Sequence, residues 1–143
     1  MTDFDLDSFL PYRLTVVAGQ VSREFARRYE KHFGLSRAEW RVLAHLSRAG
    51  TASVREIHAE ADLDKSRVSR AASRLEASGL LAKQEHPTDG RLVHLSLTTA
   101  GNDMMAQLAE MARAYQVELE QRLGPDWEKI SGLIDRLEQP ANS

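Results

Sequence analysis

Hydrophobic residues return every three or four positions along most of the chain, which predicts a largely helical protein. The first such stretch runs from Asp5 to Phe33 and is followed by Gly34, a typical C-terminal stop. Pro11 lies near its start, so we expect the regular helix to begin there after a short separate turn. A helix of this length needs a partner surface for its apolar stripe, which a second subunit could supply. The stripe consists of Leu10, Leu14, Val17, Val21, Phe25 and Tyr29.

Two shorter helices are predicted by serine–glutamate pairs three residues apart, Ser36 with Glu39 and Ser53 with Glu56. Each pair is the signature of a capping box, in which the two side chains satisfy backbone N–H groups of the first turn. The second of these helices is expected to cover Val54 to Ala61. Leu35 and Trp40 stand at the staple positions of the first helix, Leu43, Leu46 and Ile57 are the other expected inward residues, and Ala49-Gly50 ends the first helix.

The stretch from Asp64 to Gly79 predicts a helix with two different faces. The turn Asp62-Leu63-Asp64 precedes it, with Leu63 expected in the core and Asp64 as the N-cap. A short helix, a tight turn and a cationic helix form a helix-turn-helix, whose second helix lies in the DNA major groove, where arginine can bond guanine O6 and N7. An ordinary solvated surface helix is the alternative. One face holds Val68, Ala71, Ala72 and Leu75, and the other holds Lys65, Ser66, Arg67, Ser69, Arg70, Ser73 and Arg74.

Two β-type runs follow, Leu80 to His86 and Leu92 to Leu97, and the second alternates apolar with polar residues. The Asp89-Gly90 pair between them favours a tight hairpin turn. A hairpin directly after a helix-turn-helix is a wing, with Arg91 at its tip free to enter a minor groove and Asp89 positioned to pair with the guanidinium. A plain solvent hairpin is the alternative.

Two more helices close the chain. Thr98 or Thr99 is expected to cap a helix that runs to about Leu123, and Gly124-Pro125 separates it from a last helix over Asp126 to Leu137. The expected inward residues are Met104, Leu108, Met111, Tyr115 and Leu119 in the first of these helices, and Trp127, Ile130, Leu133, Ile134 and Leu137 in the second.

The composition of the 143 residues, 42% hydrophobic and 28% charged, predicts one globular domain over residues 1–143. The absence of cysteine excludes disulfides and thiol chemistry. With no long apolar run and an acidic N-terminus in place of a signal peptide, a cytoplasmic location is expected. The net charge is only −2, yet basic residues outnumber acidic ones between Asp64 and Arg91, whereas acidic residues prevail after Asn102. That asymmetry fits a protein that touches DNA with one part only.

The order of elements, with particular motifs, resembles the multiple-antibiotic-resistance regulator (MarR) family of winged-helix transcription factors. The motifs are the segment Leu35-Ser36-Arg37-Ala38-Glu39-Trp40, the stretch DKSRVSRAASRLEASGLL from Asp64 to Leu81, Asp89-Gly90-Arg91, and Leu97-Thr98-Thr99-Ala100-Gly101. The resemblance implies a mainly α fold with a small β-hairpin wing. Residues 35–100 would form the winged helix-turn-helix DNA-binding lobe, and 5–33 and 101–138 the dimerisation helices.

In function, the resemblance implies a homodimer that binds a pseudo-palindromic double-stranded DNA operator and usually represses transcription. It also implies release by a small aromatic or phenolic effector. The candidate DNA-binding residues are Lys65, Ser66, Arg67, Ser69, Arg70 and Arg74 on the helix, with Asp89 and Arg91 on the wing. Arg13, Trp40 and Tyr115 are candidate effector ligands, because an arginine beside aromatic rings suits an aromatic carboxylate; a core, dimer-seam or solvated role is the alternative for each.

Other classes of function have weaker support. The five histidines show no metalloprotease spacing, although His86 and His94 could face each other across the hairpin and bind a metal with Glu85. Solvated strand histidines are the simpler interpretation, and neither a cofactor nor an enzymatic activity is expected. A winged helix used for protein contacts would carry exposed apolar anchors, which this recognition face lacks. A regulator without any effector is a further alternative.

Overall fold

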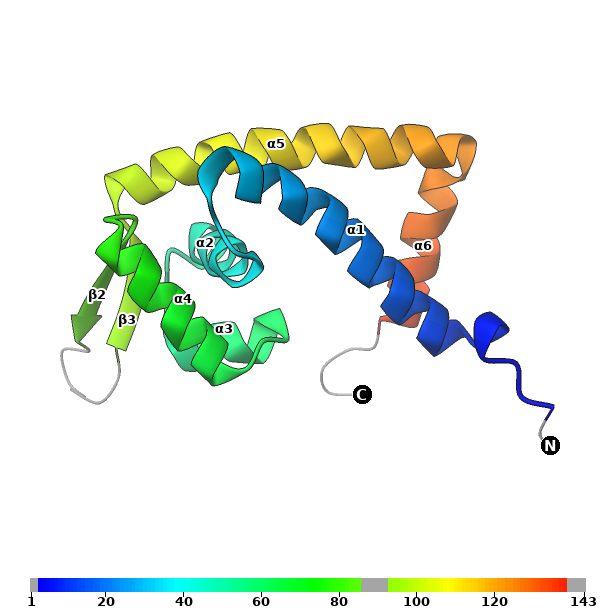
Figure 1. Cartoon of the computed structure of the whole chain (residues 1–143), viewed down its shortest axis with the longest axis horizontal. Helices are drawn as coiled ribbons and strands as arrows, with labels where there is room; N and C mark the ends of the chain where they lie inside the picture. The colour runs from blue at the N-terminus through cyan, green and yellow to red at the C-terminus, as the bar shows by residue number, and fades with distance from the viewer. Residues whose placement is uncertain (1–2, 86–92, 139–143) are drawn as a thin grey trace. The chain divides into compact units, whose positions relative to one another are not determined.

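The computed structural model describes residues 3–85 and 93–138, and it confirms a mainly helical fold with one small antiparallel sheet (Figure 1). The chain divides into two compact units, Met1–Ala109 and Glu110–Ser143; the expectation of a single domain stays a prediction. The elements in chain order are the 3-10 turn η1 (Leu6–Ser8), α1 (Leu10–Phe33), α2 (Arg37–Ala49), β1 (Thr51–Ala52), α3 (Val54–Ala61), α4 (Lys65–Ala77), β2 (Leu81–Glu85), β3 (Val93–Leu97), α5 (Thr99–Leu123), η2 (Gly124–Asp126) and α6 (Trp127–Leu137).

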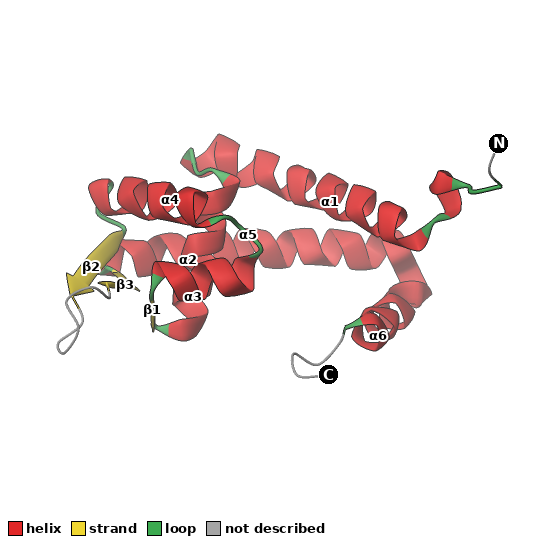
Figure 2. Ribbon diagram, turned by 90° about the horizontal axis from the view of Figure 1, so that it is seen from below, coloured by secondary structure: helices red, strands yellow, loops and turns green. Residues whose placement is uncertain are grey.

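The core of the first unit lies where α2, α3 and α4 meet the sheet (Figure 2). The apolar face predicted for α4 is buried there, which confirms the two-faced pattern of that helix. Leu63 is only half-buried, so the expectation that it fills the core holds in part. The largest fully buried side chains are Tyr29, Val42, Leu43, Leu46, Ile57, Val68, Leu75, Leu95 and Leu108.

Both predicted capping boxes are present. The Ser36 hydroxyl accepts the Glu39 backbone N–H at 3.1 Å, and the Glu39 carboxylate accepts the Ser36 N–H at 3.3 Å. Ser53 and Glu56 repeat the arrangement at the same two distances. These contacts satisfy N–H groups that have no intrahelical partner, so they fix where α2 and α3 begin.

The sheet has the strand order β1-β3-β2, with all pairs antiparallel. The two-residue strand β1 was not predicted from the sequence; it pairs Thr51 with Ser96 and Ala52 with Leu95. Along β3, Leu95 is fully buried, whereas Val93 is exposed, so the predicted alternation holds best at the centre of the strand.

Thr98 is the N-cap of α5, because its hydroxyl accepts the Gly101 backbone N–H at 3.0 Å. The same hydroxyl donates to the Gly79 carbonyl at 2.6 Å, and the Thr98 N–H donates to the Leu80 carbonyl at 3.1 Å. The start of α5 is therefore fastened to the segment that links α4 to β2.

The sequence predicted that the apolar residues of α6 face inward, and four of them do not. Ile130, Leu133, Ile134 and Leu137 are exposed, Leu133 by 53%. The helical spacing was read correctly, but the described chain offers no surface that covers this face. In the described part of the chain, no helix is both long enough and apolar enough to cross a membrane.

Candidate nucleic-acid interface

The start of α4 is fixed by the carboxylate of Asp64. Its Oδ1 accepts the Arg67 backbone N–H and the Ser66 hydroxyl, both at 2.8 Å. The Arg67 N–H bond, followed by the Ser66 bond, lowers the pKa of Asp64 below its usual value, since both stabilise the charged form. Asp64 is thus the N-cap that the sequence predicted.

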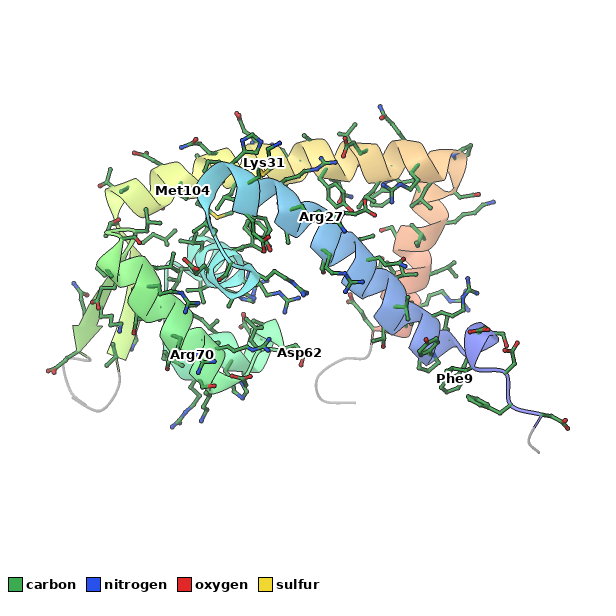
Figure 3. The ribbon with its side chains drawn as sticks, viewed as in Figure 1. Phe9, Arg27, Lys31, Asp62, Arg70 and Met104 are labelled. Carbon is green, nitrogen blue, oxygen red and sulfur yellow. The ribbon has the colours of Figure 1, made fainter. Side chains whose placement is uncertain are left out.

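The side of α4 opposite the buried face is exposed and cationic. Figure 3 shows Arg70 on this helix, beside the turn that contains Asp62. The structure brings together on one helix all the candidate DNA-binding residues predicted for it, and their contacts with DNA stay predictions. These exposed residues are Lys65, Ser66, Arg67, Ser69, Arg70 and Arg74.

The arginines on this face differ in how they are held. Arg67 Nε lies 3.6 Å from the Asp64 carboxylate, and Arg74 Nε lies 3.4 Å from Glu39, the acid of the α2 capping box. Among the residues that the structure describes, Arg70 forms no close ion pair, although its charge helps to lower the pKa of Asp64. The Arg70 guanidinium is therefore available to a partner outside the chain, whereas Arg74 is partly engaged in joining α4 to α2.

The predicted wing is described only at its base. Strands β2 and β3 pair from Leu81 opposite Leu97 to Glu85 opposite Val93. Asp89, Arg91 and His86 lie outside the described residues, so their expected roles stay predictions.

The metal site suggested for the hairpin gains no support. His94 is paired with Gln84 in the register of the strands. Within the described ranges, no group of three or more acidic or histidine side chains could hold a metal ion.

Sequence reasoning missed three residues that shape the turn between α3 and α4. Asp62 adopts the left-handed conformation, with φ 54°. The His58 ring Nδ1 donates to the Leu63 carbonyl, and the Arg41 guanidinium donates to the Ala61 carbonyl at 2.8 Å. The histidine comes from α3 and the arginine from α2, and only the left-handed preference of Asp or Asn carried a sequence signal.

The effector candidates lie in separate places. Trp40 lines a hollow of about 90 Å³, which we call the Trp40 hollow and whose other lining residues are Ser22, Phe25, Tyr29, Arg37 and Arg41. Arg13 lines another surface hollow, of about 280 Å³, with Asp7, Tyr12, Val16 and Val17. Tyr115 is buried and belongs to the second unit. Trp40 and Arg13 thus line different hollows of the described chain, and the effector roles expected for Arg13, Trp40 and Tyr115 stay predictions.

Three aromatic rings from α1 and α2 form the wall of the Trp40 hollow. The Tyr29 and Trp40 rings stack with centroids 5.9 Å apart, and Phe25 meets both edge-on at 5.1 and 5.2 Å. Tyr29 is only 1% exposed. Burial raises the pKa of Tyr29 to about 12, against the opposing pull of Arg37 and Arg41.

The chain is similar to known proteins in sequence and in fold. Residues 33–92 match the model of the MarR family. The chain is 30% identical over 110 residues to the uncharacterized HTH-type transcriptional regulator YxaD of Bacillus subtilis, covering 76% of this chain and 77% of YxaD. It is 29% identical over 111 residues to the HTH-type transcriptional repressor IacR of Pseudomonas putida, covering 78% of this chain but only 66% of the length of IacR.

A solved structure shows the same fold. BpsR of Bordetella bronchiseptica, solved in work on the regulation of its DNA binding by 6-hydroxynicotinic acid, superposes with a TM-score of 0.82 at 21% identity, covering 97% of this chain and 99% of BpsR. The relatives are transcriptional regulators, not enzymes. By its match to the family model, its likeness to YxaD and its winged helix-turn-helix, the chain belongs to the MarR family of transcriptional regulators.

Proposed function

We propose that the chain is a repressor that binds a pseudo-palindromic operator as a homodimer and leaves it when a small aromatic acid binds. The observation that carries the DNA-binding part is α4, which buries Val68 and Leu75 while exposing Arg67 and Arg70. A helix with one buried and one exposed face can place arginines against base edges while it stays packed on its own domain. Repression is supported by the likeness to IacR, a transcriptional repressor.

Dimer formation is supported by apolar side chains left exposed in each unit. In the first unit they gather on η1 and the N-terminal half of α1, and in the second on α6. Exposed apolar residues in such number mark an interaction surface, and a second copy of the chain would supply the two-fold symmetry that a palindromic operator requires. The exposed residues are Phe4, Leu6, Phe9, Leu10, Leu14 and Val17 in the first unit, and Ile130, Leu133, Ile134 and Leu137 in the second.

The effector response is supported by the fold shared with BpsR, whose DNA binding is regulated by 6-hydroxynicotinic acid. In this chain we assign the effector to the Trp40 hollow. Phe25, Tyr29 and Trp40 present ring surfaces to it, and Arg37 and Arg41 supply positive charge. An aromatic ring that carries a carboxylate complements both features.

The first experiment measures DNA binding by fluorescence anisotropy. The labelled duplex is selected by the protein from a random library, and a scrambled duplex is the control. Specific binding should weaken with salt, with a slope of roughly −0.9 per phosphate contact on a log–log scale. Equal affinity for both duplexes at every salt concentration would refute the proposal that the protein recognises a specific operator sequence.

The second experiment tests the assembly. Sedimentation of the full chain should give a dimer, and Leu133→Asp should shift it towards monomer because a charge enters the proposed interface. The matched control is Ser131→Asp, which adds the same charge to the same helix outside the apolar set. A monomeric wild-type chain at the concentrations that bind DNA would rule out the dimer.

The third experiment tests the wing. Arg91→Ala is expected to weaken binding most on duplexes with A·T-rich flanks, because narrow minor grooves concentrate negative potential. An equal loss on every flank would instead indicate a simple phosphate contact.

A further inference from the structure

We infer that Arg41 is a positioning residue that couples occupancy of the Trp40 hollow to the turn that presents α4. The inference rests on the effector response proposed above. The Arg41 side chain lines the hollow, and its Nη1 donates to the Ala61 carbonyl at 2.8 Å. Ala61 is the last residue of α3, where helix carbonyls have no intrahelical partner. One guanidinium therefore touches both the hollow and the helix-turn-helix.

The turn that Arg41 contacts depends on support from outside itself. Asp62 holds a left-handed conformation, which is uncommon for residues other than glycine although Asp adopts it more readily than most. Two side chains bond the carbonyls on either side of it, Arg41 at Ala61 and His58 at Leu63. His58 belongs to α3 and moves with that helix, whereas Arg41 reaches the Ala61 carbonyl from α2.

A ligand in the hollow must compete for Arg41. The hollow measures about 90 Å³, whereas an apolar cavity that accepts benzene has roughly 150 Å³. Phe25, Tyr29 and Trp40 are packed against one another, so the arginine side chains, the exposed Arg37 and the half-exposed Arg41, are the parts of the wall that can move. A carboxylate carries a full negative charge and can also accept two parallel N–H bonds from a guanidinium, which a single carbonyl oxygen cannot do.

An aromatic carboxylate would thus draw Arg41 away from Ala61. The turn would lose the Arg41 bond to α2, and α4 would be held less firmly in the orientation that suits the groove. Effector binding and operator binding then oppose each other within one subunit, with no change in the dimer contact required.

The test uses benzoate as the probe and the full chain as the protein. Trp40 and Trp127 are the two tryptophans, so Trp127→Phe makes fluorescence report on the hollow alone. In this background, benzoate binding is followed through Trp40, and operator affinity is followed by anisotropy on the selected duplex. Arg41→Met is compared with Arg37→Met, because both remove a positive charge from the hollow but only Arg41 bonds Ala61.

Arg41→Met should weaken benzoate-free operator binding roughly ten-fold, and benzoate should weaken it no further. Arg37→Met should weaken benzoate binding while leaving benzoate-free operator affinity within about two-fold of wild type. Equal benzoate-free affinities for the two variants would overturn the coupling through Arg41, while a wild-type operator response to benzoate would leave the proposed function standing.

Hydrogen exchange supplies a readout that does not depend on a variant's folding. In the wild-type chain, benzoate should speed amide exchange in residues 62–66, and Arg41→Met should show the faster exchange without benzoate. Unchanged or slower exchange in this turn, with Trp40 reporting saturation by benzoate, would overturn the coupling. If Trp40 reports no binding, both the hollow and the coupling fail, whereas specific DNA binding is judged separately.

Discussion

Gly101 lies so close to Leu80 that a Cβ atom on Gly101 would sit 2.0 Å from the Leu80 carbonyl oxygen. That carbonyl also accepts the Thr98 N–H. The first turn of α5 therefore rests directly on the backbone that joins α4 to β2, and only glycine allows this approach.

Gly101→Ala is expected to lower the free energy of unfolding by roughly 1–3 kcal/mol, because the backbone must shift to admit the methyl group. Gly132 in α6 is the matched control, since nothing lies within 4 Å of a Cβ at that position. Gly132→Ala should be neutral or stabilising by up to about 1 kcal/mol. Urea unfolding of both variants makes the comparison, and equal stabilities would show that the Gly101 contact is easily relieved.

Arg70→Ala should reduce the discrimination between the selected duplex and single-base variants by roughly 1–3 kcal/mol at one position, because a base-reading contact would be lost. Arg113→Ala removes the same charge from an exposed site on α5 and should leave discrimination unchanged. Anisotropy titrations on a set of single-base variants measure both. A uniform loss over all duplexes would assign Arg70 to a phosphate.

Arg74 is expected to act partly through Glu39. Glu39→Gln keeps a side chain that can complete the capping box but removes the ion pair that Arg74 makes at 3.4 Å. A double-mutant cycle with Arg74→Ala should give a coupling of about 0.2–1 kcal/mol in urea unfolding, small because the Arg74 side chain is 53% exposed. A coupling of zero would mean that the ion pair with Glu39 contributes nothing to stability, which would leave the Arg74 side chain available for DNA contacts.

The stability of the chain should fall at alkaline pH because of Tyr29. Burial raises its pKa from 10.0 to about 12, so the unfolded state loses the phenol proton first. The contribution is intact below pH 10 and disappears as the pH rises towards 12. The free energy of unfolding should decline more steeply over this window in wild type than in Tyr29→Phe. Replacing the exposed Tyr12 by Phe is the control and should keep the wild-type slope.

Local chemistry made much of the fold predictable. The serine–glutamate pairs set the starts of α2 and α3 to the residue, Gly34 marked the end of α1, and Asp64 marked the start of α4. Each signal lies within a few residues of the element that it terminates, so it can be read without knowing the tertiary structure.

Features that depend on distant residues were missed. A two-residue strand such as β1 shows no periodicity, and its partner Leu95 lies more than forty residues along the chain. Phe25 and Tyr29 were placed on the correct stripe of α1, but their contact with Trp40 depends on how α1 packs on α2. Arg41 carried no signal, because an arginine on a helix gives no indication that it will reach a carbonyl twenty residues away.

The short strand β1 also affects which edges of the sheet are open to another molecule. Because β1 pairs with one side of β3 and β2 with the other, the central strand has no open edge along the paired residues. The longer edge belongs to β2, which carries the charged residues Lys83 and Glu85. Charged side chains on an edge strand oppose strand addition by another molecule. Pairing of another strand with the described edge of β2 is therefore disfavoured.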